Sequence, residues 1–262
     1  MKRISKEIEE NIVQDYLNNI NTITISRKYN ISRSTVQKYL IKNNVEFNKH
    51  PITSRIFNHH FFDNYTPDSC YWAGFILADG YIRKNRNSLE ICLSHIDGDH
   101  LLKFTKSIGL NEDIRIYKNN TCRVSICSDV IKESLLTNFE IFNKKSLVCF
   151  ISNKIPLNML SHFIRGYFDG DGCFSSENRF SFIGTYDTCD TIRNYFKNNG
   201  ITKQDGNIPC ITEKQSKNKM YYVKYSKNLS LKIFDLLFKD STDLTRLDRK
   251  YKKILSYVNR AE

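Results

Sequence analysis

The sequence lacks an apolar run long enough to cross a membrane, although 40% of its 262 residues are hydrophobic. It also lacks a basic amphipathic anchor, and its first residues, MKRISKE, do not contain the apolar core of a signal peptide. We therefore expect no membrane partner and no secretion. The expected location is the cytoplasm, the nucleoid, the nucleus or an organelle.

Paired cysteines are missing as well. The chain has eight cysteines, but no Cys-x-x-Cys pair, and most of them stand beside apolar residues. This pattern disfavours zinc sites and disulfides. It favours buried, reduced thiols.

Acidic residues are outnumbered by basic ones. The sequence has 40 Lys and Arg against 28 Asp and Glu, which gives a formal net charge of +12. Both the first 49 residues and the rest of the chain are net basic. Because the phosphate backbone attracts distributed Lys and Arg whatever the base sequence, nucleic acid is the expected partner. The chain is also long enough to form more than one folded domain.

Residues 5 to 43 have apolar positions at helical spacing in three short stretches, which predicts three helices. At the last junction, Asn30 suits a tight turn and Ser32 suits the N-cap of the next helix. This pattern resembles a helix-turn-helix, with the reading helix from Arg33 to about Asn43.

The exposed face of that helix offers side chains suited to phosphate and base-edge contacts. They are Arg33, Ser34, Gln37 and Lys38. The alternative is a three-helix bundle whose basic face is only solvated. Turn, cap and charge agree, so we favour a DNA-binding domain over residues 1–49.

Residues 50–67 form the expected linker. Phe57, Phe61 and Phe62 favour packing of this segment against the domain that follows. His59 and His60 are adjacent, and adjacent side chains seldom point the same way, so a packing or surface role is favoured over a metal site.

From residue 68 onward the pattern runs helix, two strands, helix, two strands, helix, and then repeats. The strands come in hairpins, so the sheets are expected to be antiparallel. The predicted fold is α+β, with two pseudo-symmetric αββαββα repeats at residues 68–155 and 156–262. The small all-α helix-turn-helix domain precedes them.

Each repeat opens on a variant of one nine-residue pattern, WAGFILADG at residues 72–80 and IRGYFDGDG at residues 164–172. Both copies have small residues four positions apart, which let two helix backbones approach closely. These pairs are Gly74 with Ala78 and Gly166 with Gly170. We expect the two helices to form the interface between the repeats.

Asp79 and Asp171 are predicted at the C-terminal ends of these helices, where the helix dipole disfavours a carboxylate. Two carboxylates brought together there repel each other unless a divalent cation lies beside them, and oxygen ligands suit Mg²⁺. Metal ions beside a scissile phosphate activate water and stabilise the leaving oxygen. A helix-ending Asp-Gly turn is the alternative for each copy, but the matched pair favours catalysis.

Two further aspartates are expected to have local roles. Asp169 has Leu77 as its counterpart in the first copy, so it is interpreted as a polar residue at a helix end without a symmetric ligand role. Asp97 is expected to cap the helix that follows it.

With both motifs at the spacing of the repeats, residues 68 to about 257 resemble a single-chain LAGLIDADG homing endonuclease, a family named for this nonapeptide. The resemblance implies a monomeric enzyme that hydrolyses both strands of double-stranded DNA at a long asymmetric site. It implies Mg²⁺ as the cofactor, with Mn²⁺ as a substitute. It also implies that the antiparallel sheets bind DNA with their concave faces in the major groove.

The resemblance assigns catalytic and metal-binding roles to Asp79 and Asp171, with the backbone near Gly80 and Gly172 as an additional ligand candidate. A basic residue from each half is expected to support the site. The matching stretches offer Lys145 and Lys250, for which a solvated basic face is the alternative. The family's polar residue that orders active-site water falls near His95, and its counterpart in the second repeat is Thr185 or Tyr186.

The strands and their turns offer the expected DNA-reading residues, and strand alternation decides which of them face the DNA. They are Tyr81, Arg83, Lys84, Arg86, Glu90, Arg115, Lys118, Arg123, Ser175, Arg179, Lys214, Lys219, Tyr222 and Lys224.

Two other functions stay open. A DNA-binding regulator could keep the duplicated scaffold after losing the ability to cut, although both motif aspartates are retained. A maturase that binds intron RNA shares the same scaffold.

Overall fold

The computed structural model describes residues 4–18, 20, 22–45, 56–83, 88–110, 114–117, 119–143, 149–202, 211–214 and 220–260. The chain divides into two compact units, Met1–Arg55 and Ile56–Glu262. Each unit has a hydrophobic core of its own.

Three helices make up the described part of the first unit: α1 (Lys6–Leu17), α2 (Thr22–Lys28) and α3 (Arg33–Lys42). Their inward faces meet in a small, fully buried core of Ile12, Ile25, Val36 and Leu40. The predicted all-α unit is therefore confirmed.

The junction between α2 and α3 is formed as the sequence predicts. Asn30 has a φ of 51°, in the left-handed region that Asn tolerates better than most residues. Ser32 then accepts a hydrogen bond from the Thr35 backbone N–H and caps α3.

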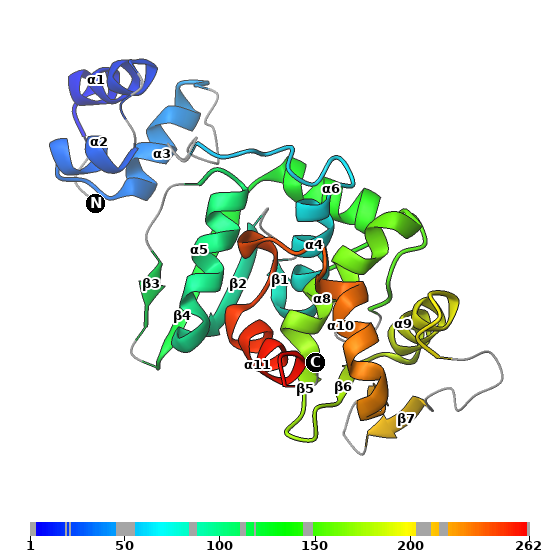
Figure 1. The fold of residues 1–262 in the computed structure, drawn as a ribbon. Coiled ribbons are helices and arrows are strands. Elements are labelled where there is room, and N and C mark those ends of the chain that lie inside the picture. Colours follow the sequence, from blue (N-terminus) through cyan, green and yellow to red (C-terminus); the bar gives the residue numbers. More distant parts are fainter. Residues whose placement is uncertain are drawn as a thin grey trace. The chain divides into compact units, whose positions relative to one another are not determined.

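The second unit contains two αββαββα repeats, as predicted (Figure 1). The first consists of α4 (Pro67–Asp79), β1 (Gly80–Ile82), β2 (Ser88–Ser94), α5 (Gly98–Ser107), β3 (Arg115–Ile116), β4 (Thr121–Cys127) and α6 (Asp129–Phe139). The second consists of α8 (Leu160–Asp171), β5 (Gly172–Phe174), β6 (Phe180–Gly184), α9 (Tyr186–Asn198), β7 (Ile211–Lys214), β8 (Met220–Lys224) and α10 (Ser230–Phe238).

Short 3-10 helices lie between these elements, and a further helix ends the chain. They are η1 (His95–Asp97), η2 (Leu157–Met159), η3 (Lys227–Leu229), η4 (Asp243–Thr245) and α11 (Asp248–Val258). The predicted αββαββα pattern has seven elements, and α11 follows the seventh of the second repeat, so it is an addition to the predicted fold. Its buried residues Ile254 and Val258 lie four apart, a spacing that could have indicated the helix.

Each repeat has one four-stranded sheet, and the two sheets share the same strand order: β1-β2-β4-β3 and β5-β6-β8-β7. All pairings are antiparallel, as predicted. The first residue of each opening strand is a motif glycine, Gly80 paired with Ile91 and Gly172 paired with Phe182. The two sheets are thus built alike, which confirms the α+β fold of duplicated halves.

Helices α4 and α8 lie side by side at the centre of the second unit (Figure 1). A Cβ added to Gly74 would lie 2.0 Å from the Phe163 carbonyl oxygen, and one added to Gly166 would lie 1.9 Å from the Tyr71 carbonyl oxygen. The two contacts occupy equivalent places in the two motif copies. Backbone therefore meets backbone at both glycines, and the predicted interface is confirmed.

Residues 56–66 pack on the second unit, as their aromatic content predicts. Phe57 and Phe62 are buried in its core, and Phe61 is partly buried against it. His59 Nδ1 lies 2.8 Å from Ser128 Oγ, whereas His60 Nδ1 lies 2.6 Å from Asp63 Oδ2. The two rings thus have separate partners.

The expectation of mostly buried thiols is wrong for three strand cysteines. Cys92, Cys127 and Cys173 are exposed, whereas Cys70, Cys122 and Cys189 are buried. Alternation along β2, β4 and β5 places the first three on outer faces even though apolar residues flank them in sequence. Within the described ranges, no helix has both the length and the apolar composition needed to span a bilayer.

Candidate active site and nucleic-acid interface

Asp79 and Asp171 are the last residues of α4 and α8. Both helices are buried up to this point, where the chain returns to the surface: Asp79 is exposed and Asp171 is half-buried. A Cβ added to Gly170 would lie only 3.2 Å from Asp79 Oδ2. The structure thus places the first motif carboxylate against the residue that precedes the second.

The charges of both aspartates also affect the pKa of the buried Tyr167 hydroxyl. Burial raises the pKa of Tyr167 well above its ordinary value, and the charges of Asp171 and Asp79 add to the effect. The Tyr167 hydroxyl donates to the Ile183 carbonyl at 2.6 Å, which fixes α8 to β6 beside the two carboxylates.

Gly80 and Gly172 follow the two aspartates in extended backbone, with φ of −75° and −83°. Glycine is needed there for space, because an added Cβ would lie 2.8 Å from the Ile76 carbonyl oxygen or 2.6 Å from that of Phe168. The helix-ending turn considered as an alternative would place glycine in the left-handed region. That geometry is absent at both positions.

Lys250, in the first turn of α11, closes the C-terminal end of α8. Its ammonium lies within hydrogen-bonding distance of four backbone carbonyls. These belong to Phe168 (2.7 Å), Asp169 (2.8 Å), Gly170 (3.1 Å) and Gly172 (2.6 Å). A positive charge at this end offsets the helix dipole that disfavours Asp171.

The charges of three carboxylates act on the same ammonium. Burial lowers the pKa of Lys250, and the charges of Asp169, Asp79 and Asp171 oppose that shift. Lys250 therefore lies in the field of both motif aspartates. The Gly172 carbonyl already accepts from this lysine, which makes it a poorer metal ligand than expected.

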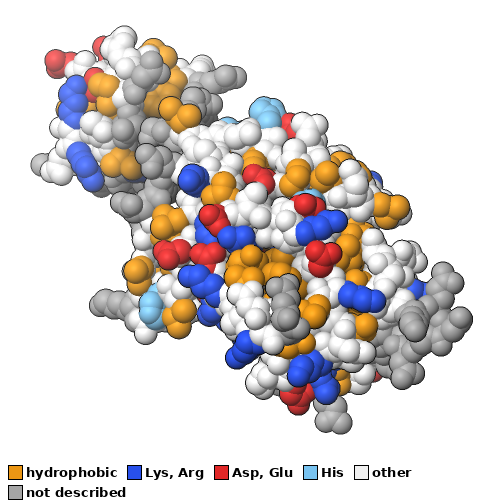
Figure 2. Space-filling view, in the orientation of Figure 1, with side chains coloured by type: hydrophobic (Ala, Val, Ile, Leu, Met, Phe, Trp, Pro, Cys, Tyr) orange, Lys and Arg blue, Asp and Glu red, His pale blue; other side chains and the backbone are white. Residues whose placement is uncertain are grey.

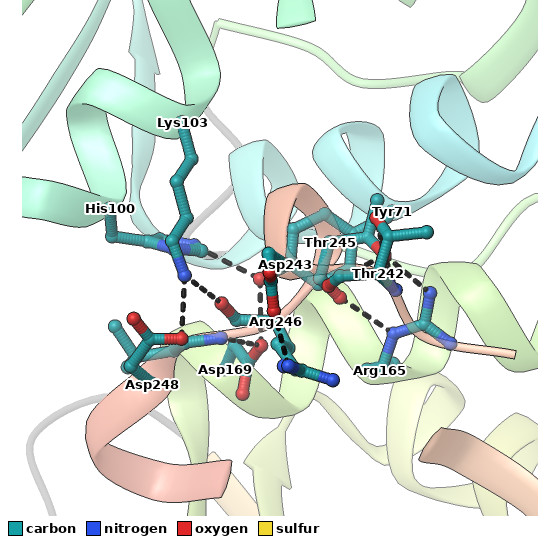
Figure 3. Close-up of polar contacts among 11 residues, drawn as sticks. Tyr71, His100, Lys103, Arg165, Asp169, Thr242, Asp243, Thr245, Arg246 and Asp248 are labelled. Atoms are coloured by element: carbon teal, nitrogen blue, oxygen red, sulfur yellow. Dashed lines mark hydrogen bonds and ion pairs between the residues drawn. The ribbon is translucent and has the colours of Figure 1, made fainter. Parts of the chain in front are cut away.

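Asp169 lies in the last turn of α8, as interpreted, but it is buried, with 2% of its surface exposed. Its Oδ2 accepts from the Tyr71 hydroxyl at 2.7 Å and from the Leu247 backbone N–H at 2.8 Å (Figure 3). Burial raises the pKa of Asp169 to about 6. The carboxylate thus joins α4, α8 and the start of α11.

His100 extends this network into the first repeat. Its Nε2 lies 3.0 Å from the Tyr71 hydroxyl. Because that hydroxyl donates its single proton to Asp169, the His100 ring donates to the Tyr71 oxygen. Burial lowers the pKa of His100 to about 3, so the ring is neutral at ordinary pH.

Arg165 fastens the segment between α10 and α11 to α8. Its guanidinium donates to the Thr245 carbonyl at 2.8 Å (Figure 3). It also donates to the Leu237 carbonyl at 2.6 Å. It also lies 5.4 Å from the centre of the Tyr71 ring. Arg165 has 1% of its surface exposed and donates to groups within the fold, so it is not available to a substrate.

Two ion pairs attach α11 to the first repeat. Lys103 Nζ lies 2.6 Å from Asp248 Oδ1, and Arg249 donates to both oxygens of Asp97 at 2.9 and 2.8 Å. The expectation that Asp97 caps α5 is therefore wrong in its chemistry: Asp97 occupies the N-cap position, but its side chain makes no cap hydrogen bond and binds Arg249 instead.

The two residues expected near active-site water are occupied elsewhere. His95 is exposed, and its Nδ1 lies 3.3 Å from the Asn120 carbonyl oxygen. Thr185 caps α9 by accepting from the Thr188 N–H, and it donates to the Cys149 carbonyl at 2.5 Å. The water-ordering role of both residues stays a prediction.

The outer face of the first sheet carries an Arg–Glu–Arg cluster. Glu90 Oε1 accepts from Arg83 Nε at 3.1 Å and Nη2 at 2.6 Å, and Arg123 Nη1 lies 3.9 Å from Glu90 Oε2. Arg123 also lies over the Tyr117 ring, 5.3 Å from its centre. Exposed Tyr81 is opposite Glu90 on the paired strand.

The second repeat has a similar cluster around an acid in the turn between β5 and β6. Glu177 Oε2 lies 3.3 Å from Arg179 Nε and 3.4 Å from Lys224 Nζ. Tyr222 and Lys224 share the outer face of β8, and Ser175 Oγ accepts from the Arg179 backbone N–H. Basic side chains thus alternate with acidic and apolar ones on the molecular surface, as Figure 2 shows for one face.

Several expected residues lie outside the described residues. They are Lys84, Arg86, Lys118, Lys145 and Lys219, together with the side chains of Arg115 and Lys214.

The expected reading helix of the first unit keeps its polar face outward. Arg33, Ser34 and Lys38 are exposed, and Gln37 is half-buried. Arg33 Nε donates to Thr22 Oγ1 at 3.0 Å, so part of its guanidinium braces α2.

The donors near Asp79 and Asp171 fit one class of metal. Among the described residues, no group of three or more His, Cys, Asp or Glu side chains gathers in one place. Mg²⁺ keeps several waters and is held by one or two carboxylates, whereas structural zinc and calcium sites need fuller ligand sets. Two carboxylates at a surface therefore suit Mg²⁺ or Mn²⁺.

Comparison with known proteins gives matches among solved structures. No family description and no curated protein matches the chain. The structure of I-DmoI in complex with DNA and Ca matches at 14% identity and a TM-score of 0.49, covering 74% of this chain and 99% of I-DmoI. The I-LtrWI LAGLIDADG homing endonuclease bound to target DNA matches at 10% identity and a TM-score of 0.47, covering 78% and 91%.

The LAGLIDADG meganuclease I-AabMI bound to uncleaved DNA matches at 13% identity and a TM-score of 0.45, covering 74% of this chain and 92% of that chain. The I-LtrWI and I-AabMI structures are named as LAGLIDADG proteins, the family that the repeated nonapeptide of this chain resembles.

Proposed function

We propose that the chain is a site-specific endonuclease that hydrolyses one phosphodiester bond in each strand of a long, asymmetric DNA duplex with the help of a divalent metal. One observation carries the proposal. Asp79 and Asp171 come from different repeats, yet they end two helices that touch along their backbones, and the Asp79 carboxylate lies against Gly170.

Asp79 and Asp171 are the residues that would hold Mg²⁺, or Mn²⁺ in its place. The ion supplies activation of water and stabilisation of the leaving oxygen beside a scissile phosphate. Lys250 fixes the backbone that ends in Asp171 and places a positive charge near the carboxylates. Lys145 stays the predicted counterpart in the first repeat.

Both carboxylates come from a single chain, so one chain suffices for the site and a monomer is the proposed active form. The repeats at residues 68–155 and 156–262 would each place the outer face of a sheet on one half of the DNA site. Arg83, Arg123 and Lys224 are the described basic residues best placed for this. Their acidic partners hold them in defined positions, which favours reading of base edges.

The domain at residues 1–49 would add contacts through α3, beyond those of the two sheets. Ser34 and Lys38 are exposed on this helix and suit phosphate contacts. Residues 50–67 link it to the first repeat.

The test is cleavage of defined DNA. Purified protein is incubated with Mg²⁺ and a library of duplexes that includes the DNA flanking its own gene, and the products are sequenced. We expect wild-type protein to cut both strands of one sequence. Asp79→Asn and Asp171→Asn should bind that sequence and lose its double-strand cleavage. Asp99→Asn removes the same charge from an exposed position on α5 and is the control that should still cut.

The same experiment separates the two rival functions. Sequence-specific binding by the wild-type protein without metal-dependent cutting would establish a DNA-binding regulator. Tight binding of intron RNA, with no cutting of any duplex, would establish a maturase. Either result contradicts the proposal.

A further inference from the structure

The two halves of the proposed site are supported differently. In the first motif, Leu77 is an apolar residue with 3% of its surface exposed. Asp169 takes the equivalent place in the second motif and is equally buried, at 2%. A buried carboxylate destabilises the fold unless hydrogen bonds or opposite charges compensate for its lost hydration. Its presence in one motif alone therefore requires an explanation.

The Asp169 carboxylate holds the start of α11. Its Oδ2 accepts from the backbone N–H of Leu247, the N-cap residue of that helix (Figure 3). Three residues later, Lys250 binds the carbonyls that end α8, among them those of Gly170 and Gly172 on either side of Asp171. The Asp169 carboxylate thus holds the helix start that places Lys250 on the backbone at both sides of Asp171.

The other hydrogen-bond donor to Asp169 comes from the interface between α4 and α8. The Tyr71 hydroxyl, on α4, donates to the same Oδ2 at 2.7 Å. Among the described residues, Asp169 Oδ1 has no hydrogen-bond partner, so the carboxylate is retained although one oxygen is unsatisfied. Buried groups left in this state point to a role beyond stability.

We infer that Asp169 is a positioning residue for the half of the active site that contains Asp171, acting through Leu247 and Lys250. This inference rests on the proposed endonuclease function. It implies that a change at residue 169 affects the hydrolysis of the two DNA strands unequally. Loss of the acceptor at residue 169 slows hydrolysis of the strand served by Asp171 more than hydrolysis of the other strand.

Strand-specific rates distinguish positioning from stability. A duplex that carries the site found by sequencing is labelled with a different dye on each strand, and single-turnover cleavage with Mg²⁺ gives both rates from one reaction. A less stable protein loses both rates together, so their ratio is independent of the folded fraction. Asp171→Asn identifies the strand that depends on Asp171.

The bond between residues 169 and 247 can be removed from either end. Asp169→Leu copies Leu77 and removes the acceptor, whereas Asp169→Asn keeps an oxygen that can accept. Leu247→Pro removes the donor at a residue with φ of −81°, which proline tolerates, after an extended Arg246 with ψ of 143°. Leu247→Ala loses the same packing and keeps the N–H.

Asp169→Leu and Leu247→Pro are expected to change the ratio of the two strand rates by about ten-fold or more, with the slower strand being the one that Asp171→Asn identifies. Asp169→Asn and Leu247→Ala are expected to keep a ratio close to wild type. Equal slowing of both strands, an unchanged ratio in the first pair, or a changed ratio in the second pair overturns the inference. If wild-type protein cuts neither strand, the proposed function itself fails.

Discussion

A lysine at the C-terminal end of a helix can offset the helix dipole that disfavours an acidic residue there. The last carbonyls of α8 have no partners within the helix, and their dipoles repel the Asp171 carboxylate. The ammonium of Lys250 lies within hydrogen-bonding distance of three of these carbonyls and of the Gly172 carbonyl, and it places a positive charge beside them. Its contribution to activity is therefore expected to come with a contribution to stability.

Replacing this lysine should lower both quantities. We expect Lys250→Met to lower the free energy of unfolding by about 2 to 4 kcal/mol, because buried carbonyls lose their donor. Cleavage should fall by about 100-fold as charge near the carboxylates is lost. Urea denaturation and single-turnover cleavage measure the two effects.

Lys253 on the same helix provides the matched control. It is exposed, and its Nζ donates to a single carbonyl, that of Phe174, at 2.6 Å. Lys253→Met should cost about 1 kcal/mol and leave cleavage near wild type. Equal effects of the two substitutions would contradict the role given to Lys250.

Three buried groups set the response of stability to acid. Burial lowers the pKa of His100 to about 3 and that of His162 to about 4, from 6.5. Burial raises the pKa of Asp169 from 3.8 to about 6. Between pH 6 and pH 4 the unfolded chain binds two protons on the histidines that the folded chain does not bind, whereas the folded chain binds one on Asp169.

These groups therefore make the unfolded state bind one more proton, so stability should fall by about 1.4 kcal/mol per pH unit as pH is lowered across this window. Urea denaturation at several pH values measures the slope. Glutamine can still accept from Arg165, to which His162 Nδ1 is bonded at 3.0 Å. His162→Gln should thus flatten the dependence, and an unchanged slope in this variant would count against the assignment.

At the scale of helices, the nonapeptide was informative because its signals are local. Small residues four apart predicted the contact of α4 with α8, and Asp-Gly predicted where both helices end. The role of Asp169 could not be read in the same way. Its partner Leu247 lies 78 positions further along the chain, and the bond exists only after α11 has packed.

Strands show the same limit. The sequence left open which strand candidates face outward, and in the structure Tyr81, Arg123 and Lys224 lie on outer faces. Apolar neighbours in the sequence gave the wrong burial for Cys92 and Cys173, because in a strand the adjacent residue faces the opposite side. Burial of a strand residue is decided by its register, and composition of the local window does not report register.

The close contact of α4 with α8 makes a strong prediction about its glycines. Gly166→Ala and Gly74→Ala each place a Cβ about 2 Å from a backbone oxygen that cannot move alone. We expect each substitution to lower the free energy of unfolding by about 3 kcal/mol or more. Thermal and urea denaturation measure this loss.

Gly98, the first residue of α5, is the matched control. A Cβ there would meet Cys122 Sγ at 3.6 Å, an ordinary contact, and the backbone is already helical. Gly98→Ala should keep or raise stability, by up to about 1 kcal/mol. If it destabilises as much as Gly166→Ala, the loss is not due to the helix interface.

For the whole molecule, charge is shared between two units that fold around separate cores. The net charge of +12 does not form one continuous basic patch on the face in Figure 2, where acidic side chains stand among the basic ones. Affinity for a long duplex is therefore expected to be a sum of small contributions from both units. Each phosphate contact then adds about 0.9 to the slope of log affinity against log salt concentration.

Lys38 tests whether the first unit contributes to that sum. Lys38→Ala in the full chain should weaken DNA binding and reduce the salt slope by about 1, while cleavage of bound DNA keeps its rate. Lys28→Ala removes the same charge from a lysine that is already paired with Asp15 at 2.8 Å, so it should leave the slope unchanged. Fluorescence anisotropy at several salt concentrations measures both. On a duplex shortened at the end bound by the first unit, wild type and Lys38→Ala should bind alike, since α3 then has no DNA to contact. Identical salt slopes for the two proteins on the full-length duplex would show that Lys38 does not contact DNA and would contradict the prediction.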